Sequence, residues 1–136
     1  MSETIHYKLD VQVFGGPRML VENSLSVEAY DKLKITLAKA DPPDKEVQIQ
    51  PGDETRVAFL LIIPSSYDHP VTYKTAIIGT PTIYKLDTFH LYNGKGMAVS
   101  LGCGLKTLYF TNNSPSLSRQ DIDIDILVGR YATPQL

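Results

Sequence analysis

The sequence has a single cysteine, no tryptophan and no long apolar run. Because Cys103 stands alone, neither an intramolecular disulfide nor a multi-cysteine zinc site can form. The longest apolar stretch, residues 57–64, has about eight residues, whereas a membrane-spanning helix needs roughly 20. The fold must therefore be held together by packing alone, and the sequence predicts no membrane-spanning helix.

A strong charge of either sign is also missing. Lys and Arg total 13, Asp and Glu total 15, and the net charge is −2. Such a chain has no general electrostatic attraction to nucleic acid or to an anionic membrane, so we expect neither as a partner.

The first residues lack the basic region and apolar core of a signal peptide. We therefore expect synthesis in the cytoplasm without a cleaved leader. A subunit that is incorporated into a particle after synthesis would share these features, so the sequence leaves that destination open.

The overall composition is that of a globular protein. Hydrophobic residues make up 43% and charged residues 21% of the 136 residues, which argues against disorder. A chain of this length buries roughly two-thirds of its unfolded surface. With no repeat and no shift in composition, we predict one domain over residues 1–136.

Apolar residues recur at every second position near the N-terminus. From Ile5 to Val13 they alternate with polar and charged residues, which predicts a half-buried strand with one polar face. Phe14-Gly15-Gly16-Pro17 predicts a turn, because glycine permits positive φ and proline cannot continue a ladder. A second extended run covers residues 18–27.

Similar runs continue to the C-terminus. Residues 55–63 are almost continuously apolar, which is typical of a strand buried on both faces. Residues 26–40 have a composition that suits a helix, but the alternation of Leu33, Ile35 and Leu37 with polar residues favours a strand over residues 32–39. Further strands are predicted over residues 46–50, 71–78, 97–101, 105–111 and 120–131, and an irregular extended stretch over residues 82–92.

The pattern amounts to about nine or ten short strands, with turn signals every 8–12 residues or so and little or no helix. We predict an all-β fold, specifically an antiparallel two-sheet sandwich of jelly-roll type.

An acidic row near the C-terminus is the sharpest local feature. In a strand, Asp121, Asp123 and Asp125 point the same way, roughly 7 Å apart, and the isoleucines between them point the other way. Water, basic residues on a paired strand or a cation must offset their repulsion. Calcium needs about 6–8 oxygens, so the row supplies only part of a cation site. The simpler interpretation is a solvated face that discourages edge-to-edge pairing.

The tyrosines suggest a binding surface. If residues 82–92 are extended, Tyr84, His90 and Tyr92 share one face, and Asn93 follows at a turn. Aromatic, imidazole and amide groups of this kind suit a glycan or a small ligand. The alternative is a set of half-buried strand tyrosines whose hydroxyls reach water.

Catalytic chemistry has little support in the sequence. Cys103 lies between two glycines with no helix after it to lower its pKa. The histidines His6, His69 and His90 lack the spacing of a metal motif, and a zinc site of His69, His90 and Cys103 has only composition in its favour. We expect no enzyme activity, no cofactor and no bound metal.

Two functions fit these observations. The first is a non-enzymatic subunit that assembles with copies of itself, as virion and appendage subunits do, which the tyrosines and the sandwich architecture favour. The second is a module that binds a small ligand or carbohydrate through loops at one end of the sandwich. The first is our prediction, and an apolar patch larger than a few hundred Å² on the surface would favour it.

Overall fold

The computed structural model describes residues 3–38, 41–49, 57–67, 70–94, 107–113 and 121–131. Its described part contains ten strands and no helix, so none that could span a membrane. The strands are β1 (Glu3–Gln12), β2 (Arg18–Val27), β3 (Ala29–Leu37), β4 (Lys45–Gln48), β5 (Val57–Pro64), β6 (Val71–Lys74), β7 (Tyr84–Lys85), β8 (His90–Asn93), β9 (Thr107–Asn112) and β10 (Ile122–Arg130).

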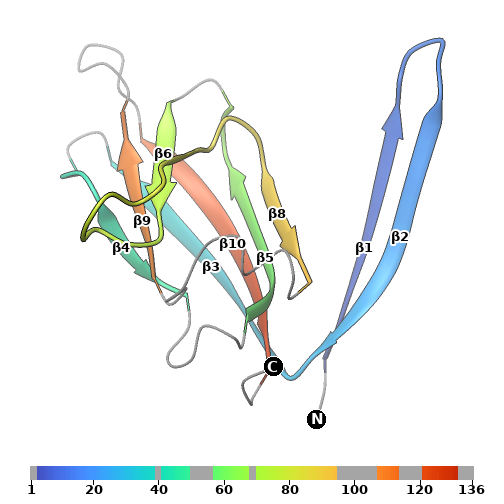
Figure 1. The fold of residues 1–136 in the computed structure, drawn as a ribbon, viewed down its shortest axis with the longest axis horizontal. Coiled ribbons are helices and arrows are strands. Elements are labelled where there is room, and N and C mark those ends of the chain that lie inside the picture. Colours follow the sequence, from blue (N-terminus) through green and yellow to red (C-terminus); the bar gives the residue numbers. More distant parts are fainter. Residues whose placement is uncertain are drawn as a thin grey trace.

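Eight of these strands form a sandwich, which confirms the all-β prediction. One sheet has the order β3-β10-β5-β8 and the other the order β4-β9-β6-β7, and every pairing is antiparallel. The two sheets lie face to face on the left of Figure 1. The remaining two strands, β1 and β2, form a separate sheet of their own.

The core lies between the two four-stranded sheets, and strand alternation explains its composition. Along β10, Ile122, Ile124 and Ile126 are buried, while the intervening aspartates lie on the outer face. Strand β5 is buried along most of its length because it lies between β10 and β8. Phe110 of β9 and Tyr73 of β6 complete the core from the opposite sheet.

Strands β1 and β2 form a long hairpin whose ten residue pairs run from Glu3–Val27 at the base to Gln12–Arg18 at the tip. The predicted turn is confirmed, and the Val13 and Pro17 backbones hydrogen-bond across it. Gly15 has a φ of 73°, a conformation that residues with a Cβ rarely adopt.

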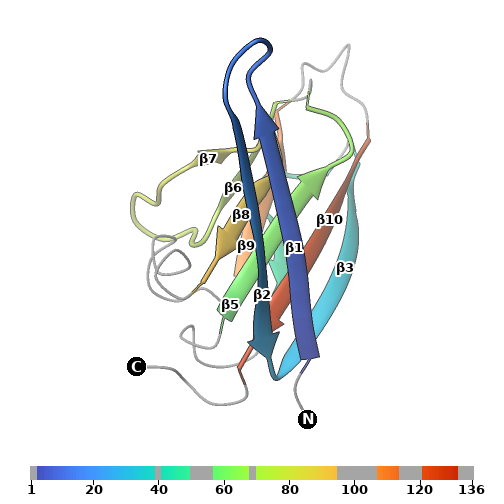
Figure 2. The same ribbon diagram turned by 90° about the vertical axis from the view of Figure 1, so that its right-hand side faces the viewer.

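The hairpin stands outside the sandwich. It lies over the outer face of the β3-β10-β5-β8 sheet, as Figure 2 shows, and its ribbon moves away from that sheet toward the tip in Figure 1. The sequence predicted a half-buried strand over residues 5–13, but most of β1 is exposed on both faces. The alternation specified a face for burial, and none of the described residues covers the distal part of that face.

The stretch over residues 82–92 is not a single strand. Tyr84 and Lys85 pair with β6 in one sheet, and His90–Asn93 pairs with β5 in the other. Between them the chain crosses from sheet to sheet, with Leu86 buried. Strand β6 ends at Lys74, earlier than predicted, and the predicted strand over residues 97–101 lies outside the described residues.

Candidate functional site

The hairpin has one apolar and one polar face. The apolar hairpin face comes from alternate residues of both strands, which the register places side by side: Leu9 opposite Val21 and Val11 opposite Met19. Its members are Ile5, Tyr7, Leu9, Val11, Val13, Met19, Val21, Leu25 and Val27. We call Leu9, Val11, Val13, Met19 and Val21 its distal half.

Exposure of this face rises steadily toward the tip. Val27 is buried at the base, whereas the exposed fraction is 41% at Leu9, 48% at Val11 and 57% at Val13. Phe14, at the turn, is fully exposed at 102%. Large apolar side chains exposed in a continuous row are unusual on the surface of a monomeric protein.

The base of the hairpin packs against its own sandwich. The ring of Tyr7 lies 6.3 Å from that of Phe59 in β5, and the Tyr7 hydroxyl accepts a hydrogen bond from the Asn93 amide. Ile5 lies so close to the backbone of Gly129 that a Cβ there would be 2.7 Å from its Cδ1 atom. The apolar hairpin face is therefore the face that is turned toward the sheet.

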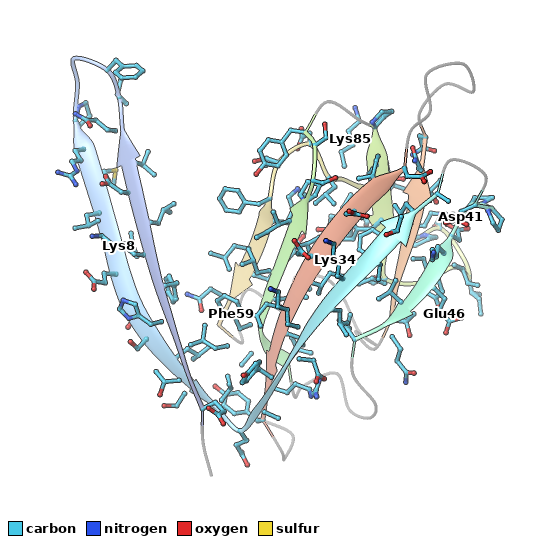
Figure 3. The ribbon with its side chains drawn as sticks, turned by 180° about the vertical axis from the view of Figure 1, so that it is seen from behind. Lys8, Lys34, Asp41, Glu46, Phe59 and Lys85 are labelled. Atoms are coloured by element: carbon cyan, nitrogen blue, oxygen red, sulfur yellow. The ribbon has the colours of Figure 1, made fainter. Side chains whose placement is uncertain are left out.

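The sheet presents an apolar strip on the same side. Leu61 and Ile63 follow Phe59 at every second position of β5 and therefore share its face. Leu127 of β10 pairs with Leu61. Lys32 and Asp125 flank these residues, and the group surrounds a surface hollow of about 290 Å³. We call Leu61, Ile63 and Leu127 the sheet strip. Figure 3 shows Phe59 on the side of the sheet that faces the hairpin.

The polar face of the hairpin carries charge pairs in solvent. Arg18 donates two hydrogen bonds to the Asp10 carboxylate, at 2.9 and 2.7 Å. This interaction lowers the pKa of Asp10 and raises that of Arg18. His6 lies 3.3 Å from Glu22 on the same face. Exposed pairs of this kind add little stability, so the polar face is a solvated surface.

The predicted tyrosine site forms a cluster around Tyr73, a residue that the sequence analysis did not single out. The buried Tyr73 hydroxyl lies 2.6 Å from both the His90 Nδ1 atom and the Tyr92 hydroxyl. Tyr84 stacks on Tyr73 with ring centroids 5.2 Å apart. The crossing between sheets thus brings Tyr84, His90 and Tyr92 together, whereas Asn93 faces away and binds Tyr7.

Burial governs the ionisation of this cluster. It raises the pKa values of Tyr73 and Tyr92 above their ordinary value, and it lowers the pKa of His90. At neutral pH all three groups are therefore uncharged. Their polar atoms bind one another and link β6 of one sheet to β8 of the other.

A hollow of about 370 Å³ lies on the surface nearby. Two segments contribute to it, through Tyr67 and Pro70 on one side and Lys85, Leu86 and Asp87 on the other. Tyr84, His90, Tyr92 and Asn93 are not among its lining residues.

The acidic row is offset by the neighbouring strand. Asp123 lies opposite Thr36 and Asp125 opposite Lys34 on β3. The Thr36 hydroxyl donates to Asp123 at 2.7 Å, and the Lys34 ammonium lies 3.9 Å from it. Asp121 precedes the strand and is exposed. Basic and hydroxyl groups on a paired strand are thus the compensation that the structure shows.

Within the described residues, no three His, Cys, Asp or Glu side chains gather in a way that would hold a metal ion. His69 and Cys103 lie outside the described residues. Comparison with protein-family models, with curated proteins and with solved structures gave no match.

The exposed apolar row is the surface that sequence reasoning missed. Period-two alternation looks the same in a strand that its own chain covers and in one that another molecule covers. One signal was available: Phe14 is a large apolar residue within a Gly-Gly-Pro turn, where polar residues are usual.

Proposed function

We propose that this protein is a non-enzymatic structural subunit that assembles with copies of itself. The observation that carries the proposal is the exposed row on the apolar hairpin face. The five side chains of the distal half are 41–69% exposed and Phe14 is fully exposed, whereas monomeric proteins rarely expose a contiguous apolar patch larger than a few hundred Å². A surface of this size is costly in water and favours association.

The strand order supports membership of a class in which assembly is common. We propose that the sandwich is a jelly roll. The pairs β3–β10, β4–β9, β5–β8 and β6–β7 arise when a single eight-stranded antiparallel ribbon is rolled into two sheets. Jelly rolls form viral capsid subunits and lectins, among other proteins, so the argument from fold class is one of association. Incorporation into a particle after synthesis in the cytoplasm is part of the proposal.

Light scattering during gel filtration tests self-association directly. The full chain should elute with a mass that is a defined multiple of 15.1 kDa and should dissociate on dilution. A single chain's mass at every concentration up to the solubility limit would contradict the proposal.

One observation favours a second function, the binding of a small ligand or carbohydrate. The hollow of about 370 Å³ combines an aromatic ring, Tyr67, with the charged groups of Lys85 and Asp87. Its size lies within the ~300–1,000 Å³ range of ligand sites. Saturation-transfer NMR with a panel of oligosaccharides tests this function, and loss of signal in Tyr67→Ala but not in Tyr30→Ala would assign the site.

A further inference from the structure

We infer that two copies of the chain exchange hairpins, so that the distal half of each apolar hairpin face packs on the sheet strip of the other copy. This inference rests on the proposed self-association and specifies its surface. It concerns two features that lie on the same side of the molecule. One is the exposed distal half of the apolar hairpin face, which we call the arm, and the other is the sheet strip of Leu61, Ile63 and Leu127.

The arm cannot readily cover the strip of its own chain. Only Glu28 separates β2 from β3, and its backbone N–H donates to the Arg130 carbonyl at 2.9 Å. Val27 is buried against Gly129, and Ile5 packs over the same glycine. These contacts fix the direction in which the hairpin leaves the sheet, so closing its distal half would break the packing at its base.

The strip continues the surface on which the hairpin base already sits. Phe59, Leu61 and Ile63 follow one another at every second position of β5, about 7 Å apart. Tyr7, Leu9 and Val11 have the same spacing along β1. Because Tyr7 packs on Phe59 in one chain, a strand of the same pattern fits the next two positions of the strip.

The area fits a stable dimer. The side chains of the distal half are 41–69% exposed and Phe14 is fully exposed, which with the partly exposed sheet strip amounts to several hundred Å² on each copy, against about 800 Å² per partner in a standard interface. In a two-fold arrangement each copy provides both an arm and a strip, so both of these apolar surfaces are covered and the assembly closes. A second copy is therefore the occupant that fits both surfaces at once.

Two neighbouring residues of β2 provide matched variants. Met19 and Leu20 are both large, apolar and exposed, at 69% and 52%, but Met19 lies on the apolar hairpin face and Leu20 on the polar face. Met19→Lys should raise the dissociation constant at least about tenfold, because it places a charge in an apolar contact, whereas Leu20→Lys should leave it unchanged. Light scattering over a dilution series measures both constants, and circular dichroism checks that each variant is folded.

Cross-linking identifies the surface that receives the arm. In a Cys103→Ser background, a chain with Val11→Cys is mixed with a differently tagged chain that carries Ile63→Cys, and a short bis-maleimide is added. We expect a cross-linked product that contains both tags. Gln12→Cys, which lies on the opposite face of the same strand, should give little of this product.

The outcomes separate the two proposals. A wild-type oligomer that Met19→Lys does not weaken, or that gives no product with both tags, overturns hairpin exchange and leaves self-assembly standing. A monomeric wild type overturns both proposals. If one chain carrying both cysteines is bridged only within itself, the hairpin closes on its own sheet and the exchange is wrong.

Discussion

At the scale of single residues, Gly129 shows why a missing side chain matters at the base of the hairpin. A Cβ at this position would lie 2.7 Å from Ile5 Cδ1, 3.1 Å from Val27 Cγ1 and 3.3 Å from Phe59 Cβ. Real side chains do not approach so closely, so β10 has a glycine where the hairpin packs against it.

Gly129→Ala should therefore lower the free energy of unfolding by about 1–3 kcal/mol through overpacking. Ile5→Val removes the Cδ1 atom, so the double variant should recover part of this loss. Urea unfolding of the wild type, both single variants and the double variant measures the coupling. If the loss of unfolding free energy in the double variant equals the sum of the losses in the two single variants, Ile5 is not the side chain that requires the glycine.

We expect His90 to make the stability of the folded protein depend on pH. Burial lowers its pKa, while the negative charge of Asp87 and a hydrogen bond with the Lys85 backbone partly oppose the shift. Its Nδ1 atom lies 2.6 Å from the Tyr73 hydroxyl, and in the neutral tautomer with its proton on Nε2 this nitrogen can accept a hydrogen bond from that hydroxyl. A proton on Nδ1 would remove this acceptor, so the folded protein favours the neutral form.

Linkage between protonation and folding gives the direction in which stability changes with pH. The unfolded chain binds a proton at His90 below the ordinary pKa of 6.5, and the folded chain does so only at lower pH. The contribution of neutral His90 is therefore complete above pH 6.5 and is lost as the pH falls through the folded pKa. Melting temperatures across this range should fall less in His90→Asn than in the wild type.

At the scale of elements, the hairpin and the sandwich differ in how they are stabilised. No residue of the hydrophobic core cluster lies in residues 3–28, although Val27 is itself buried beside Gly129. An isolated two-stranded hairpin is marginally stable in water, whereas an eight-stranded sandwich has a core of its own. The hairpin thus depends on the sandwich for its stability, whereas the core of the sandwich contains no residue of the hairpin.

Removal of residues 1–26 should consequently leave a folded sandwich that retains Val27. Phe59 would lose its cover from Tyr7, at a cost of about 2–4 kcal/mol out of the ~5–15 kcal/mol typical of a domain. We expect a single cooperative thermal transition at a lower temperature and a near-ultraviolet circular dichroism signal from the buried tyrosines. A shortened chain without that signal would show that the hairpin is needed for folding.

Strand alternation was enough to predict most of the elements. It identified the hairpin, the buried β5 and the outward aspartates of β10, because each follows from a local period of two. It also favoured a strand at β3 over the helix that composition suggested.

Long-range features were beyond the sequence pattern. The grouping of Tyr84, His90 and Tyr92 came from a predicted shared strand face, but the structure brings them together because the chain crosses between sheets and Tyr73 enters from β6. The exposure of Leu9 and Val11 depends on the direction in which the hairpin leaves its base, which Val27 and Gly129 set. No local pattern encodes that direction.

At the scale of the whole molecule, charge and apolar surface are distributed differently. The net charge is only −2, and acidic side chains are paired with basic ones, as in Arg18–Asp10 and Lys74–Asp44. Long-range repulsion between copies is therefore weak, and seven of the fourteen exposed large apolar side chains of the described residues lie on the hairpin. Association should then be driven by burial of apolar surface.

Salt separates this mechanism from association through charge. Between about 0.1 M and about 1 M sodium chloride, screening becomes strong but apolar burial is not weakened, so the dissociation constant should stay within about threefold. Sodium sulfate should tighten association, because it strengthens apolar burial. Sedimentation velocity measures both effects, with Lys34→Ala as a control that changes the charged row of β3 and β10. A different result is that salt weakens association tenfold or more and that Lys34→Ala abolishes this salt dependence. The contact between copies would then be the row of Lys34, Asp123 and Asp125, and the hairpin would have no part in it.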